Sequence, residues 1–310
     1  MLIVNQHMAV LYAPHKFAFG GHLGNSIFYL ISGYGLSSSF MKHPLMAGEW
    51  FRRRLLKVVI PLVFIIGILN IGDLQGFTVE LLNQLVWHKV EQLEYFLPVL
   101  WVLYALFIPL YKMKLHNQKM LLTAMLFSSL VIFLLTIHSL QIVPSDLPSK
   151  GVFFAINGLI CFTLGIIFNG IEMERVLAKY GHKVLLLPLI IFPQILHKVI
   201  IMFAPRYVFL NFYLNLVCVI ALFLLFLSIN KNILTSTALR MRDIASSSLA
   251  VYLVHFGIIK LAKEVGIIFP FNIFFVFAHS FLWAYAATKI INGLNSALLA
   301  KLEVIRANNH

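Results

Sequence analysis

Two histidines could do chemistry because they lie in apolar stretches where ionisable side chains are rare. His7 follows Asn5 and Gln6 in an otherwise aliphatic segment, and His255 lies ten residues into the apolar run 245–261. At a rise of 1.5 Å per residue His255 would lie about 15 Å deep in a membrane. A neutral imidazole can accept a proton from a hydroxyl at neutral pH. A hydrogen bond to a neighbouring helix would explain either histidine equally, so both interpretations stay open.

A cluster of cations is the second chemical feature. Arg53, Arg54 and Lys57 follow an apolar run, and Arg54 and Lys57 are spaced to share one face of a helix. Guanidinium and ammonium groups bind phosphates well. The same residues are also typical of a cytoplasmic anchor beside a membrane helix. The cluster therefore predicts an anion site or a topology signal.

The apolar run 23–41, which lies between the two features, is unusually rich in small and polar residues. Each buried polar group must find a partner inside the protein, so this helix should face other helices or a cavity. Glycines allow a ligand or another backbone to approach closely. We expect a channel or close helix packing here, with these residues as candidates: Asn25, Ser32, Gly33 and Tyr34. Asn25 is also a candidate oxyanion donor.

Composition sets the class of protein. The 310 residues are 61% hydrophobic and 11% charged, with a mean hydropathy of +0.91, whereas about a quarter of the residues of a soluble domain are charged. The net charge of +13 has no soluble domain to carry it, so we attribute it to loops beside anionic lipid and exclude nucleic-acid binding.

Cys161 and Cys218 lie in apolar runs and are interpreted as buried thiols. No linker marks a second domain, so residues 1–310 are predicted to form one.

The apolar runs predict an all-α polytopic membrane protein with about ten transmembrane helices. Their residues are 1–13, 23–41, 55–72, 95–111, 121–140, 151–171, 184–203, 208–229, 245–261 and 265–288. The first run is too short to span a bilayer and is expected to be the outer end of a truncated helix. If every run crosses, a cytoplasmic N-terminus places 17 of the 24 lysines and arginines inside, so both termini are predicted to be cytoplasmic, in the cell membrane. No histidine or carboxylate pairs have metal-ligand spacing on one helix, so no metal is expected.

Three motifs in order resemble the membrane acyltransferase 3 family. LGNSIFYLISGYGL followed by RLLKVVIP is similar to its GVxLFFxLSGY helix and the RxxR helix start after it. LEYFLPVLWVLYALFIPLY resembles its aromatic WFL…LYxxxP helix, and IASSSLAVYLVHFGI resembles its SYxIYLxH helix. Together these motifs extend over nearly the whole chain.

The resemblance implies transfer of an acyl group, most often acetyl, from cytoplasmic acyl-CoA to a hydroxyl of a cell-surface or lipid-linked polysaccharide. It makes His7 the catalytic base in preference to His15, which lies in a polar loop, and assigns acyl-CoA binding to Arg53, Arg54 and Lys57. Tyr252 and His255 match the last motif and become candidate channel or substrate residues.

This chain departs from the family pattern in two ways. Only six residues precede His7, so the arginine that the family carries before its histidine has no counterpart, and lysine stands at the second RxxR position. Either the start at Met1 is misassigned and a longer protein exists, or the chain is an inactive truncated relative. A separate alternative is a transporter or flippase of a lipid-linked or anionic solute, which would use the same cations and polar helix faces without a covalent step.

Overall fold

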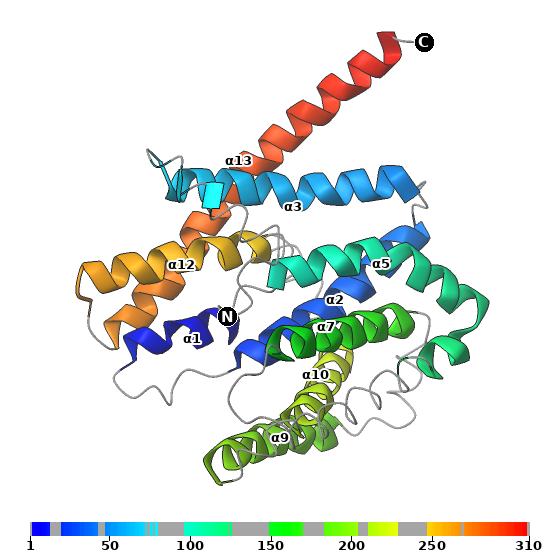
Figure 1. Cartoon of the computed structure of the whole chain (residues 1–310), viewed down its shortest axis with the longest axis vertical. Helices are drawn as coiled ribbons and strands as arrows, with labels where there is room; N and C mark the ends of the chain where they lie inside the picture. Colours follow the sequence, from blue (N-terminus) through cyan, green and yellow to red (C-terminus); the bar gives the residue numbers. More distant parts are fainter. Residues whose placement is uncertain are drawn as a thin grey trace. The chain divides into compact units, whose positions relative to one another are not determined.

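The computed structural model is helical throughout the residues that it describes (Figure 1). These are residues 2–12, 20–42, 47–71, 73, 75–76, 78–79, 96–123, 125, 149–169, 183–203, 210–228, 247–267 and 270–308. Within these ranges the prediction of an all-α protein is confirmed.

The helices follow the apolar runs of the sequence. Their bounds are α1 Leu2–His7, η1 Met8–Leu11, α2 Gly21–Lys42, α3 Ala47–Leu69, α5 Phe96–His116, α7 Ser149–Phe168, α9 Lys183–Phe203, α10 Leu210–Ser228, α12 Ser248–Glu264 and α13 Phe271–Asn308. Every predicted run falls on one of them except 121–140, most of which lies outside the described residues.

Two of the described helices are long and apolar enough to cross a membrane. They are Phe96–His116, with a mean hydropathy of 1.7, and Phe271–Leu294, with 1.4. Shorter apolar helices cover Ala155–Phe168, Leu186–His197 and Tyr213–Phe226. The chain is thus a membrane protein by composition, and the number of about ten spans stays a prediction.

The chain divides into two compact units. The first comprises Met1–Gly21, Gly48–Asn83 and Lys231–His310, and the second comprises His22–Ala47 and Gln84–Asn230. The first unit therefore holds α1, η1, α3, α12 and α13, and the second holds α2, α5, α7, α9 and α10.

In the first unit α12 packs beside α13 and against α1 and η1 (Figure 1). A tight turn ends α12: Gly266 has φ +71°, its N–H donates to the Lys263 carbonyl, and the Ile267 N–H donates to the Ala262 carbonyl. This pair of bonds is a Schellman motif, which needs a left-handed residue and so favours glycine. Asn272 Nδ2 donates to the Leu11 carbonyl at 2.9 Å and ties the start of α13 to the end of η1.

In the second unit α2 crosses α7 at close range. A Cβ at Gly33 would lie 2.0 Å from the Phe162 carbonyl oxygen, and a Cβ at Gly165 would lie 2.0 Å from that of Leu30. A hydrogen bond also joins α2 to the start of α5: the Tyr29 hydroxyl donates to the Phe96 carbonyl at 3.2 Å. Glycine is required at both crossing points because any side chain would displace a backbone.

Candidate functional site

His7 lies where the first helix changes its winding. The α-helical turns of α1 end at His7, and the 3₁₀ turn η1 begins at Met8. Tyr12, directly after η1, donates its hydroxyl to Asn5 Oδ1 and so bridges this junction. Such 3₁₀ turns are common at the C-terminal ends of α-helices, and Tyr12, which follows, is extended. The junction holds His7 on a short element that a side-chain hydrogen bond supports.

The ring of His7 packs against α12. Its centroid lies 5.1 Å from that of His255 with an interplanar angle of 76°, and 4.6 Å from that of Phe256 at 86°. The Tyr252 ring lies 5.6 Å from the His255 ring. The side chain of His7 is only partly buried, whereas His255 is fully buried. The structure therefore brings together three of the residues singled out from the sequence, which are His7, Tyr252 and His255.

One hydrogen bond defines the tautomer of His255. Its Nδ1 lies 3.2 Å from the Val251 carbonyl oxygen. Since a carbonyl only accepts, Nδ1 carries the hydrogen, and Nε2 is left with a lone pair. Nε2 is buried and has no hydrogen-bond partner among the described residues. A buried acceptor next to His7 is thus available for an N–H group.

The cation cluster lies within α3, near its start, and not in a connecting loop. Arg53 Nη2 donates to Glu49 Oε1 at 2.6 Å, one helical turn earlier, in an exposed ion pair. Arg54 is partly buried and Lys57 is exposed. Arg53 is thus paired with Glu49, and an anion site at Arg53, Arg54 and Lys57 stays a prediction.

The far end of α3 contacts α12 close to the level of His255 along the helix axis. Leu69 Cδ2 lies 2.6 Å from where a Cβ of Gly257 would be, and Gly257 comes two residues after His255. Counted along α3 at 1.5 Å per residue, Arg54 and Lys57 lie about 18–22 Å from Leu69. The histidine pair and the cations are therefore associated with opposite ends of one helix.

The remaining candidates lie on α2, in the second unit. Gly33 is buried in the crossing with α7, so close helix packing accounts for it. The Tyr34 ring packs against Phe223 at 5.3 Å, and Ser32 is partly buried. Asn25 Oδ1 is buried without a partner among the described residues. A channel along α2 stays a prediction.

The sequence analysis did not identify one cluster of buried polar side chains. Asn157 Nδ2 and Asn215 Nδ2 both donate to Ser26 Oγ, at 2.6 and 2.8 Å, and Ser26 Oγ donates to the His22 carbonyl at 2.8 Å. These residues join α2, α7 and α10. The signal that could have revealed them is the presence of asparagines within two otherwise apolar runs, 151–171 and 208–229, since such a group needs a buried partner.

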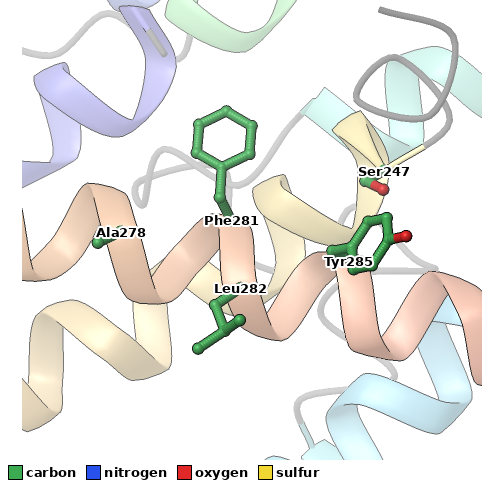
Figure 2. Close-up of a pocket in the computed structure, with 5 residues that line it drawn as sticks. All are labelled: Ser247, Ala278, Phe281, Leu282 and Tyr285. Carbon is green, nitrogen blue, oxygen red and sulfur yellow. The ribbon is translucent and has the colours of Figure 1, made fainter. Parts of the chain in front are cut away.

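A pocket of about 440 Å³ lies on the first unit, lined by Ser247, Ala278, Phe281, Leu282 and Tyr285. Figure 2 shows four of these residues along α13, with Phe281 and Leu282 projecting from different sides of the helix. No candidate site residue lines this pocket. Within the described ranges no group of three or more His, Cys, Asp or Glu side chains could hold a metal ion, and the expectation of a metal-free site stays a prediction.

Comparison with known proteins gives one match. A family model described as an acyltransferase domain matches residues 1–289. Neither a curated protein nor a solved structure matches the chain.

Proposed function

Because the chain belongs to the membrane acyltransferase 3 family, we propose that it transfers an acyl group, in the simplest case acetyl, from cytoplasmic acyl-CoA to a hydroxyl of a cell-surface or lipid-linked glycan. The observation that carries the proposal is the partly buried imidazole of His7, supported at the α1–η1 junction and packed on α12. The family match supports an acyltransferase in general, and the donor and acceptor are our inference from the chemistry of the residues.

His7 acts as the general base of this reaction. Its unprotonated nitrogen takes the proton of the acceptor hydroxyl while the hydroxyl oxygen attacks the carbonyl carbon of the thioester. The carbon–sulfur bond then breaks, and the imidazolium returns the proton to the leaving thiolate. The products are an O-acylated glycan and free coenzyme A. A partly buried ring suits this role because one edge is held by packing while the rest stays accessible to substrate.

Arg54 and Lys57 hold the donor by its phosphates. Charge-assisted hydrogen bonds from cations to phosphate are stronger than neutral ones, and these two side chains lie one turn apart on α3. Their separation from Leu69, about 18–22 Å along the helix, suits a donor whose phosphates and thioester are joined by a long flexible arm. Phosphate binding at one membrane surface and proton abstraction at the other would then use opposite ends of the same helix.

The test is acyl transfer by the protein in lipid nanodiscs, with radiolabelled acetyl-CoA and a panel of surface glycans. We expect His7→Ala to lower kcat by about 10²–10⁴-fold, the range for loss of a general base. His279→Ala is the matched control, because His279 also lies in a helix and its Nδ1 bonds the Phe275 carbonyl of its own turn, at 2.9 Å.

If wild type and His7→Ala transfer equal amounts of radiolabelled acetyl to glycan, His7 takes no part in the mechanism. A transporter would show a different pattern, namely movement of a lipid-linked solute across proteoliposomes with no label in any glycan. That pattern would overturn the proposed function.

A further inference from the structure

We propose that His255 is a positioning residue for His7: its Nε2 accepts the N–H of the His7 imidazole and so directs the other nitrogen of His7 at the acceptor hydroxyl. This inference rests on the proposed function and adds the group that orients its base. It starts from the juxtaposition of two imidazoles on different helices of the first unit, with centroids 5.1 Å apart.

The hydrogen bonding of His255 prepares it to accept and not to donate. Nδ1–H is committed to the Val251 carbonyl one turn earlier on α12, at 3.2 Å. Nε2 therefore presents a lone pair, and it is buried without a partner in the part of the chain that the structure describes. The whole side chain is fully buried, so water does not reach it freely.

A purely packing role explains this arrangement poorly. A buried acceptor that lacks a donor is destabilising, and a phenylalanine of similar shape would fill the same space without that cost. The neighbouring Tyr252 and Phe256 rings, at 5.6 and 4.0 Å from His255, already supply the aromatic packing. An acceptor at this position is best explained by a donor that it receives during function.

His7 is the donor that the geometry offers. Its ring meets His255 edge to face at 76°, and the terminal torsion of histidine is broad, so rotation of the partly buried ring brings an N–H toward Nε2. With that N–H bonded, the opposite nitrogen of His7 is the unprotonated one. When this nitrogen takes the proton of the hydroxyl, His7 becomes an imidazolium, and its bond to Nε2 becomes charge-assisted and therefore stronger. His255 itself gains no proton in this cycle.

The test compares two substitutions of His255 in the nanodisc assay. His255→Phe keeps an aromatic ring but removes the acceptor, and we expect kcat to fall about 10- to 100-fold with KM for acetyl-CoA unchanged, as for loss of a hydrogen bond to a charged group. His255→Gln supplies an amide oxygen as acceptor and should recover kcat to within about fivefold of wild type by the same reasoning. The matched control is His279→Phe, because the Nδ1 of His279 also bonds the carbonyl four residues earlier.

Two kinetic results would overturn the proposal. The first is a kcat of His255→Phe equal to that of wild type. The second is an equal loss of kcat in His255→Phe and His255→Gln when both melt at the wild-type temperature, because a positioning role by an acceptor predicts rescue.

A spectroscopic measurement keeps the proposal testable if either variant fails to fold or if the wild type transfers no acyl group. Solid-state NMR of ¹⁵N-histidine-labelled protein, with the His7 signals assigned by their loss in His7→Ala, reports the tautomer of His7. A single tautomer with a hydrogen-bonded N–H supports the contact with His255, and a mixture of both tautomers excludes it. If the protein transfers no acyl group but His7 shows a single tautomer, the proposed function is wrong and the contact between His7 and His255 is still supported.

Discussion

Gly33 and Gly165 allow the backbones of α2 and α7 to touch. Each glycine faces a carbonyl of the other helix, and a Cβ at either position would lie 2.0 Å from the carbonyl oxygen of Phe162 or Leu30. Small residues at such a crossing let dispersion contacts between backbones replace the hydrophobic effect, which contributes little between helices surrounded by lipid. The close crossing of α2 and α7 therefore requires glycine at both positions.

We expect Gly33→Ala to lower the free energy of unfolding by about 1–3 kcal/mol, the usual cost of overpacking. The added methyl group meets a backbone oxygen that no rotamer change can move. Gly35→Ala is the control on the same helix: its Cβ would meet nothing within 4 Å, so it should raise stability by about 0.5–1 kcal/mol because alanine loses less backbone entropy in a helix than glycine. Thermal unfolding in detergent measures both, and equal melting temperatures for the two variants would contradict the close crossing.

The hydroxyl of Ser26 should matter more than that of any exposed serine. Ser26→Ala leaves the amide groups of Asn157 and Asn215 without their shared acceptor, so we expect a loss of about 1–3 kcal/mol. Ser39→Ala, an exposed position on the same helix, should be neutral. Urea unfolding followed by tryptophan fluorescence compares them. A Ser26→Ala protein as stable as wild type would mean that the two amides find other partners.

The three cations of the cluster should differ in how strongly their loss weakens binding of the acyl donor. Arg54→Ala and Lys57→Ala are expected to raise KM for acetyl-CoA about 10- to 100-fold, the effect of losing a charge-assisted hydrogen bond to phosphate. Arg53→Ala should raise it much less, because Arg53 is bonded to Glu49 on the surface. Rising ionic strength should weaken donor binding in the wild type. If Arg53→Ala proves the most damaging of the three, then Glu49 releases Arg53 when the donor binds, and our division is wrong.

The predicted orientation of the chain in the membrane can be tested with single cysteine substitutions. Cys161 and Cys218 are fully buried, so wild-type protein should give little background with a membrane-impermeant maleimide. We expect Asp73→Cys, at an exposed position predicted to lie outside the cell, to react in intact cells, and His116→Cys, exposed at the end of α5, to react only after lysis. The opposite pattern would invert the charge-based topology and separate the proposed sites from their substrates.

The sequence by itself determined the class of the protein, its helices and its family. Apolar runs of sufficient length predict helices because backbone polar groups in lipid must be satisfied within their own segment. That rule is local, and each described helix overlaps a predicted run, although α3 begins eight residues before its run and α13 continues twenty residues beyond its own. The histidine at position 7 and the cations after the second run were also visible, because charged and titratable groups are costly in such surroundings.

Only the tertiary structure decided which of these residues meet. The approach of His255 to His7 joins positions 248 residues apart, and the convergence of two asparagines on Ser26 joins three helices. Helix faces in apolar segments are nearly uniform, so periodicity gives no register between helices. Register comes from steric fit at glycines such as Gly33 and Gly165 and from pairing of buried polar groups. Both depend on atoms brought together from distant parts of the chain.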